Sequence, residues 1–337
     1  MRNDQGHQIH DPAELLSARI LIVFATHNGS NTLHTMLAAY EEVEQPTRSW
    51  AIVAVDNAST DETSQVLARY AKSLPLVTLD EAQPGKNHAL NRALDAVGSS
   101  ADLYIFTDDD AVPERDFLTQ WEAVLEAKPD TELFGGAVTP YFEQEPPGWL
   151  RKYRPHFPEL YAITDHAEGP IAAERIFGPN MAVRGSILAK GVRFNGEIGP
   201  NASQSEYPMG SETEFCQRAV QHTSASPWFA AKPRVQHIVR PFQMTKDYVG
   251  QRAYRHGRGT ALRQFIAQPD QMAFYTSLKS RLFTALARLA GSAQIGRFWW
   301  TYNWRRGFAS WQDVVAAKRS AAEHTQTPPS KAPRTAA

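Results

Sequence analysis

The sequence predicts an α/β fold in which helices flank a mainly parallel, twisted sheet, with a helical extension after it. Apolar runs of strand length alternate four times with helix-patterned segments in the first 130 residues, and the connecting loops are short. Such alternation is typical of a parallel sheet with right-handed crossovers. The chain of 337 residues, 42% of them hydrophobic, is also large and apolar enough to bury a sizeable core.

Each predicted strand is a short apolar run bounded by turn or capping residues. The first two are residues 18–26 ("ARILIVFAT") and 50–57 ("WAIVAVDN"), followed by the helices "TLHTMLAAYEEV" and "STDETSQVLARYAKS". The next pairs are "PLVTLD" with "GKNHALNRALDAVG" and "DLYIFTD" with "ERDFLTQWEAVLEAK". Because ligands bind at the carboxyl ends of parallel strands, the polar residues after these runs are the first candidates for a site.

The pattern changes after Pro140, where a stretch rich in proline and aromatics predicts a long irregular loop. A strand and turn ("RIFGPNMAVRGSIL"), a helix ("SETEFCQRAVQH") and a strand ("RVQHIV") follow, and the chain is mostly helical beyond Pro241. We therefore expect a polar arm (1–18), one domain (19–240, halves 19–140 and 141–240), a basic helical extension (241–320) and a disordered tail (321–337). The extension includes an amphipathic helix at 277–290.

Charge is unevenly distributed, although the net charge is only −1. Residues 231–310 contain fourteen Lys and Arg but two acids, a local balance of +12. This excess predicts an anionic partner for the C-terminal third, such as a membrane surface or a lipid phosphate in contact with 241–310. The alternative is that the leucine stripe and the aromatics of this extension pack on the domain. With one cysteine, Cys216, and no signal-peptide pattern, we expect a cytoplasmic protein, peripheral at the inner face of the cell membrane.

Three consecutive acids, Asp108, Asp109 and Asp110, directly follow the fourth predicted strand. Two like charges about 4 Å apart repel by about 4 kcal/mol at an effective dielectric near 20, so the cluster needs a neutralising partner. A divalent cation shared with substrate phosphates would supply one. A solvated capping loop is the bland alternative. An aspartate-nucleophile phosphatase with Asp108 as nucleophile is another, but that class expects the motif on the first strand.

Other polar residues are ambiguous from pattern alone. Asp56 ends the second strand and could contact a base or ribose, or could instead form an Asx turn. Glu212 and Glu214 begin a helix, where one could act as a general base or both could simply complement the helix dipole. His237 lies in an apolar run, where a lone histidine is more often a core residue than a ligand. The sequence contains neither a P-loop nor a dinucleotide-binding glycine motif.

Taken together, six motifs resemble those of a family-two glycosyltransferase with the GT-A fold. They are "FATHNGS", "VDNASTDET", "GKNHALNRAL", "FTDDDAVP", "FGPNMAVR" and "GSETEFCQRA", which occur in the family's order and usual spacing between about Ile20 and Gly259. Each motif is weak alone, and their order carries the resemblance.

The resemblance implies roles for specific residues. Thr26, Asn28, Asp56, Lys86, Asp108 and Asp109 would bind the donor, Asp110 and His237 would bind Mg²⁺ or Mn²⁺, and Glu212 would be the catalytic base. We place Trp149, Asn180 and Glu214 on the acceptor side. The base motif departs from the family's Glu-Asp, since here it reads Ser211-Glu212, which leaves Glu214 as a second candidate.

The implied reaction is a single inverting displacement. It moves a sugar from a nucleotide-sugar donor, with a UDP-sugar favoured, to a hydroxyl of a glycan or lipid-linked acceptor in cell-surface or extracellular polysaccharide synthesis. The Gln-x-x-Arg-Trp motif of processive synthases is absent, and we expect no nucleic-acid partner. The alternatives are the phosphatase and a non-catalytic module that binds sugar nucleotides or glycans.

Overall fold

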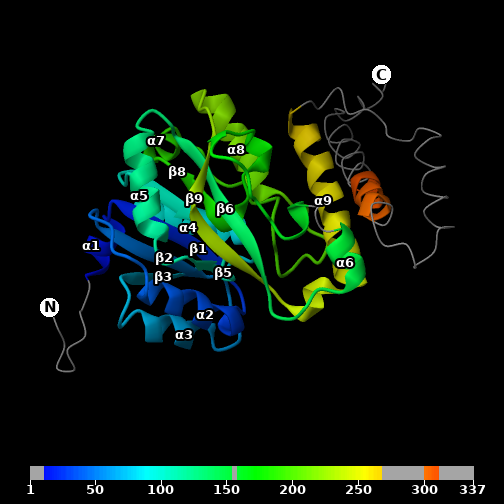
Figure 1. Ribbon diagram of the computed structural model, residues 1–337, viewed down its shortest axis with the longest axis horizontal. Coiled ribbons are helices and arrows are strands. Elements are labelled where there is room, and N and C mark those ends of the chain that lie inside the picture. Colours follow the sequence, from blue (N-terminus) through cyan, green and yellow to red (C-terminus); the bar gives the residue numbers. More distant parts are fainter. Residues whose placement is uncertain (1–10, 154–157, 268–299, 311–337) are drawn as a thin grey trace, which may run out of the picture.

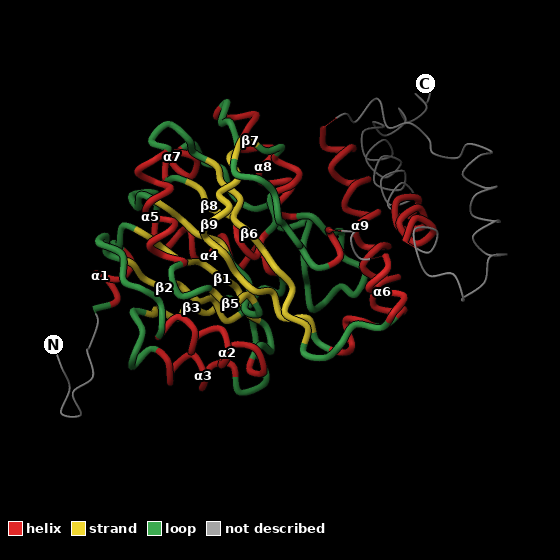
Figure 2. The backbone as a smooth tube through the Cα atoms, viewed as in Figure 1, coloured by secondary structure: helices red, strands yellow, loops and turns green. Residues whose placement is uncertain are grey.

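The computed structural model describes residues 11–153, 158–267 and 300–310. Within them, the strands form one sheet in the order β3-β2-β1-β4-β8-β6-β9-β5, with β7 paired to β9. Figure 2 shows the strands as a continuous band between helices. Their bounds are β1 Ile20–Thr26, β2 Trp50–Asp56, β3 Leu76–Asp80, β4 Leu103–Phe106, β5 Ala111–Pro113, β6 Leu133–Phe142, β7 Gly169–Pro170, β8 Met181–Val183 and β9 Trp228–Val239.

The first half of the sheet confirms the predicted topology. β1 pairs in parallel with both β2 and β4, and β2 pairs in parallel with β3. Alternate residues of β1 face opposite cores: Ile20 and Ile22 belong to one buried cluster, Leu21 and Val23 to the other. A strand buried on both faces reads as a continuous apolar run, which is why the pattern was recognisable.

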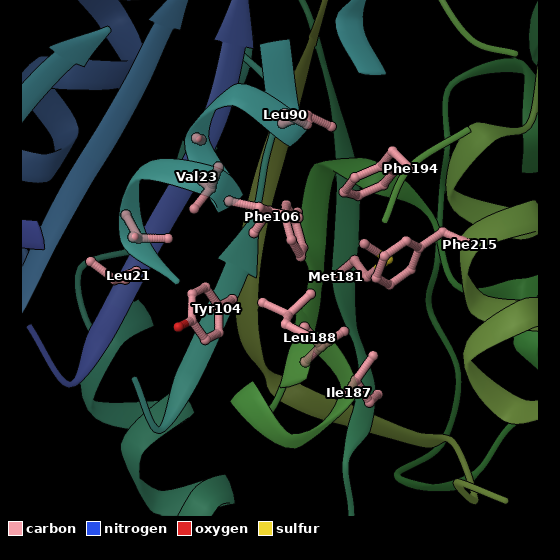
Figure 3. Close-up of a cluster of buried hydrophobic side chains, with 14 of the residues drawn as sticks. Leu21, Val23, Leu90, Tyr104, Phe106, Met181, Ile187, Leu188, Phe194 and Phe215 are labelled. Atoms are coloured by element: carbon pink, nitrogen blue, oxygen red, sulfur yellow. The ribbon is translucent and has the colours of Figure 1, made fainter. Parts of the chain in front are cut away.

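Helices cover both faces of the sheet. Their bounds are α1 Pro12–Leu16, α2 Ser30–Glu41, α3 Thr63–Tyr70, α4 Lys86–Val97, α5 Phe117–Ala127, α6 Gly148–Tyr153, α7 Gly185–Ala189, α8 Ser211–Thr223 and α9 Lys246–Ala267. Side chains of α2, α3 and α5 join one core, and those of α4, α7 and α8 join the other. In the latter, Phe194 stacks on Phe215 at 4.4 Å between ring centroids and meets Phe106 edge-on (Figure 3).

The second half of the sheet differs from a simple parallel array. β8 runs antiparallel between β4 and β6, whereas β6 and β9 pair in parallel over nine residues with one register shift at Gly136/Ala137. β6 was not predicted, because its "GG" and Pro140 resemble turn residues. Between Phe142 and β8, the described residues (143–153 and 158–180) form only short helices, the two-residue strand β7 and one isolated bridge, close to the irregular loop that we expected.

The ends of the described chain pack on the domain. Part of the predicted polar arm forms α1, and Leu15 and Ala18 join the core beside α4. At the other end, α9 lies between the domain and the helical residues 300–310 (Figure 1). A Cβ on Gly259 would be 1.6 Å from the carbonyl oxygen of Met209, so the contact of α9 with the loop before α8 requires glycine.

Some predictions fall outside the described residues. The amphipathic helix at 277–290 and the tail at 321–337 belong to these segments. In the part of the chain that the structure describes, none of the helices has both the length and the apolar character needed to cross a bilayer.

Candidate active site

A cavity of about 450 Å³ lies at the carboxyl ends of β1 and β4. The first residues of α4 and α8, the loop at 159–162 and residues of α9 also line it. The sheet therefore places the cavity at the edge where parallel strands bind ligands. Of the residues selected from the sequence, Thr26, Lys86, Asp108, Asp109, Asp110, Glu212 and His237 line it.

Lys86 connects the acidic motif to the candidate base. Its Nζ donates to Oδ1 of Asp108 at 2.6 Å and to Oε1 of Glu212 at 2.8 Å. The three residues come from the start of α4, the end of β4 and the start of α8, so tertiary packing alone brings them together. All three side chains are largely buried, which strengthens the ion pairs relative to a surface location.

Burial and pairing have opposite effects on these groups. Burial alone would lower the pKa of Lys86, but the carboxylates of Asp108 and Glu212 outweigh it and raise that pKa. Burial likewise favours the neutral form of Glu212, yet the charge and hydrogen bond of Lys86 bring its pKa below the ordinary value. Glu212 is therefore ionised at neutral pH and able to accept a proton.

The pKa of Asp109, unlike that of Glu212, is raised. Burial and the neighbouring charge of Asp110 raise its pKa to about 7, and the hydroxyl of Thr26, which donates to Oδ2 at 2.5 Å, offsets only part of the increase. Gly29 leaves room for this pair, because a Cβ there would be 2.2 Å from Oγ1 of Thr26. The "HNGSN" turn thus fits closely over the acidic motif.

Asp110 and His237 form a second pair of potential ligands. Oδ1 of Asp110 lies 3.3 Å from Nε2 of His237, whose Nδ1 lies 2.7 Å from the carbonyl oxygen of Tyr161. A carbonyl accepts only, so Nδ1 carries a proton and Nε2 is directed toward the carboxylate. Burial would lower the pKa of His237, but Asp110 raises it overall.

This pair fits a divalent cation that is shared with a ligand. Among the described residues, no group of three or more His, Cys, Asp or Glu is arranged to hold a metal by itself. Mg²⁺ is commonly bound through one or two protein ligands plus substrate phosphates, and the fixed tautomer of His237 is the usual arrangement for a ligand. Asp110 and His237 could hold such an ion once phosphate oxygens complete its coordination.

Asn28 and Asp56 do not line the cavity. Asn28 adopts a left-handed conformation (φ 53°), and its Oδ1 accepts from the backbone N–H of Thr60 at 2.8 Å. Asp56 accepts from the backbone N–H of Ser59 at 3.0 Å, which is the Asx-type turn considered above. Asn28 thus connects the turn after β1 to the turn after β2, whereas the hydrogen bond of Asp56 stays within its own turn.

The three predicted acceptor-side residues also lie away from the cavity. Glu214 is buried and forms a two-pronged ion pair with Arg218, at 2.7 and 2.8 Å. Asn180 is buried under the register shift and donates to the carbonyls of Ala137 and Pro233, both at 3.0 Å. Trp149 packs against the cluster around Leu150. The geometry therefore favours Glu212 over Glu214 as a group that meets substrate.

Sequence analysis missed several lining residues. Arg240 follows β9, while Tyr248, Arg252 and His256 come from α9. The one available signal was the spacing of four between the last three, which places them on one face of a helix. This spacing does not reveal that the face lines the cavity, because the orientation of α9 depends on its packing against the loop at Met209.

Comparisons with known proteins agree with this architecture. Residues 21–190, half of the chain, match a family model described as "Glycosyl transferase family 2". None of the curated proteins matches the chain.

Among solved structures, a mannosyltransferase from Pyrobaculum calidifontis, PcManGT in complex with GDP-Man and Mn²⁺, has 17% identity and a TM-score of 0.53, with 93% of this chain and 77% of that one covered. The S. aureus TarS fragment 1–349 has 13% identity and a TM-score of 0.48, with 90% and 92% covered. The same fragment in complex with UDP has 14% identity and a TM-score of 0.46, with the same coverage.

Proposed function

Because the chain belongs to glycosyl transferase family 2 and has the GT-A type of fold, we propose that it is an inverting sugar transferase with Glu212 as its base. One observation carries the assignment of the base. Glu212 is the one of the two candidate glutamates that lines the cavity, and its carboxylate is held 2.8 Å from Lys86, next to the acidic motif. The family match gives the phosphatase alternative no support.

The proposed reaction is a single displacement at the anomeric carbon. Glu212 accepts the proton of an acceptor hydroxyl while the hydroxyl oxygen forms a bond to that carbon. The bond to the diphosphate oxygen breaks on the opposite face, and its electron pair leaves with the nucleoside diphosphate. General-base catalysis of this kind is worth roughly 10²–10⁴-fold in rate.

Cations of the site stabilise the leaving group. Lys86 is close enough to the acidic motif to contact a diphosphate there and to release Glu212 from its ion pair. Mg²⁺ or Mn²⁺ held by Asp110 and His237 would neutralise charge on the departing diphosphate. The mannosyltransferase complex, which contains Mn²⁺ and GDP-Man, supports including both this ion and a guanosine donor among the candidates.

The donor and the acceptor can each be assigned a chemical class. We propose a nucleotide sugar, with a UDP-sugar as the first candidate and a GDP-sugar as the second, and a hydroxyl of a glycan or lipid-linked acceptor in polysaccharide synthesis. We also propose a cytoplasmic enzyme that contacts anionic membrane through 241–310. Vesicle sedimentation at low salt tests this last point, since binding should weaken as salt screens the charges.

Thermal unfolding tests the donor site without knowledge of the acceptor. The protein is heated with UDP, GDP, dTDP or CMP, each with Mn²⁺ and again with EDTA. A ligand at 100 times its Kd adds about 2.7 kcal/mol to the free energy of unfolding, so the midpoint should rise by a few degrees with one nucleotide and fall back in EDTA. No shift with any nucleotide would contradict the proposed function.

A further inference from the structure

Three cavity-lining side chains of α9 form one stripe. Tyr248, Arg252 and His256 are spaced by four residues, so they project from one face of the helix, and all three line the cavity. The neighbouring Arg255 lies on another face, where its Nε donates to the carbonyl of Ser205 at 2.8 Å. Together with Arg240 after β9, the stripe brings part of the basic C-terminal third into the site.

Arg252 differs from two other partly buried arginines, which have partners. Arg218 pairs with Glu214, and Arg184 donates to three backbone carbonyls. The described residues provide no ion pair for Arg252, and its buried Nε has no hydrogen-bond partner; the same is true of buried Nδ1 in His256. A buried nitrogen without an acceptor is costly, and Nε of Arg240, which also lines the cavity, lacks one too, so the cavity favours a ligand that supplies acceptors.

The helix that carries the stripe also contacts the loop that leads to the candidate base. Met209 donates its backbone N–H to the carbonyl of Arg255 at 3.0 Å and accepts from Arg263 at 3.1 Å. Three residues later the same loop delivers Glu212 to the cavity. The packing of α9 against this loop therefore places the stripe in the same cavity as Glu212.

We propose that Tyr248, Arg252 and His256 bind a phosphate group of the acceptor, close to the hydroxyl that is glycosylated. The proposal rests on the proposed function and deepens it by assigning an anionic acceptor. A guanidinium provides a planar pair of donors that suits a phosphate, and the phenol and imidazole can donate to its remaining oxygens. The excess of positive charge in 231–310 would attract such an acceptor.

Calorimetric titration tests this subsite with a defined probe. sn-Glycerol 3-phosphate, and glycerol as its uncharged counterpart, are titrated into protein saturated with UDP or GDP and Mn²⁺, so that the donor diphosphate site is already filled. We expect binding of the phosphate ester but not of glycerol. Arg252→Met should raise the Kd of the ester at least about tenfold, and Arg252→Lys should have an intermediate effect.

Arg255→Met is the matched control, because it removes one positive charge from the same helix outside the cavity and should leave the Kd within about twofold. Retained stabilisation by the nucleotide shows that each variant is folded. Equal affinity for glycerol and its phosphate, or no binding of either, would overturn the proposal while leaving the proposed function intact. A loss of nucleotide affinity in Arg252→Met with unchanged binding of the ester would also overturn it, since Arg252 would then serve the donor diphosphate. Absence of nucleotide binding in the unmutated protein would overturn both proposals.

Discussion

The ammonium group of Lys86 lies 2.8 Å from Oε1 of Glu212 and holds it beside the acidic motif. One cation therefore serves two parts of the site, the acids after β4 and the glutamate at the start of α8. The candidate base Glu212 is therefore ionised but already paired. In our account a bound diphosphate attracts Lys86 and leaves the carboxylate of Glu212 available to the acceptor.

Replacement of Lys86 should alter the pH dependence of turnover. In Lys86→Met the charge that lowers the pKa of Glu212 is lost and burial, which raises it, remains. The acid limb of the pH profile, where Glu212 becomes protonated, should move to higher pH, and nucleotide affinity should fall. Release of nucleoside diphosphate from the donor across pH measures this. Lys86→Arg keeps the charge and should keep the limb in place; an unmoved limb in Lys86→Met would argue against Glu212 as the base.

Gly178 should be needed for the position of the base and not for folding. A Cβ at this residue would lie 2.4 Å from Oε1 of Glu212, the movable end of a flexible side chain. Gly178→Ala should therefore lower turnover by roughly 10-fold or more, up to the full contribution of a general base, with little change in the unfolding midpoint. Gly148→Ala, whose Cβ would meet nothing within 4 Å, is the control. Full turnover in Gly178→Ala would contradict the assignment.

Removal of one proposed metal ligand should uncouple the nucleotide from the cation. In Asp110→Asn, stabilisation by UDP or GDP should become weaker and insensitive to EDTA, because the cation loses its carboxylate. Thermal unfolding with and without Mn²⁺ measures the effect. Asp95→Asn, an exposed acid on α4, should behave as the unmutated protein does. Stabilisation of Asp110→Asn that still depends on Mn²⁺ would place the ion elsewhere.

Glu122 should contribute to stability far from the site. Its buried carboxylate accepts hydrogen bonds from the backbone and hydroxyl of Thr47 and from the backbone and guanidinium of Arg48, at 2.8–3.1 Å. Glu122→Gln should lower the free energy of unfolding by about 1.5–3 kcal/mol in urea at pH 7. Glu126→Gln should cost less than about 1 kcal/mol, because that partner of Arg48 is exposed.

The hydrogen bonds of Glu122 also make the free energy of unfolding depend on pH. Burial raises the pKa of Glu122, but the hydrogen bonds from Thr47 and Arg48 lower it overall in the folded state. A lowered folded pKa means that the stabilisation is present above the unfolded value of about 4.3 and is lost as pH falls through the folded value. The difference between the unmutated protein and Glu122→Gln should therefore shrink below about pH 4. A constant difference would contradict this explanation.

The local hydrophobic pattern was sufficient to predict the strands in the first half of the sheet. β1 and β2 are buried on both faces, so their apolar runs mark strands without any knowledge of neighbours. β6 could not be recognised because its glycines serve tertiary packing: a Cβ on Gly136 would be 2.2 Å from Nδ2 of Asn180. The same contact explains why Asn180, expected on the acceptor side, is instead buried at the register shift between β6 and β9.

The candidate site likewise contains residues that local sequence pattern predicts and residues that it does not. Asp108 and Glu212 follow a strand and begin a helix, and such positions are visible in a sequence. Arg252 is not visible in this way, because its role depends on how α9 packs against the loop at Met209. Charge counting identified the basic C-terminal third, but only the fold shows that Arg240 and Arg252 are its arginines that line the cavity among the described residues.

The most direct test of the central claim compares Glu212→Gln with Glu214→Gln. Donor turnover and nucleotide affinity are measured for both, with UDP- and GDP-sugars and Mn²⁺. We expect Glu212→Gln to lose at least about 10²-fold in turnover and to keep nucleotide affinity, whereas Glu214→Gln should lose its ion pair with Arg218 and some stability but keep turnover. Unchanged turnover in Glu212→Gln, or an equal loss in folded Glu214→Gln, would contradict this expectation.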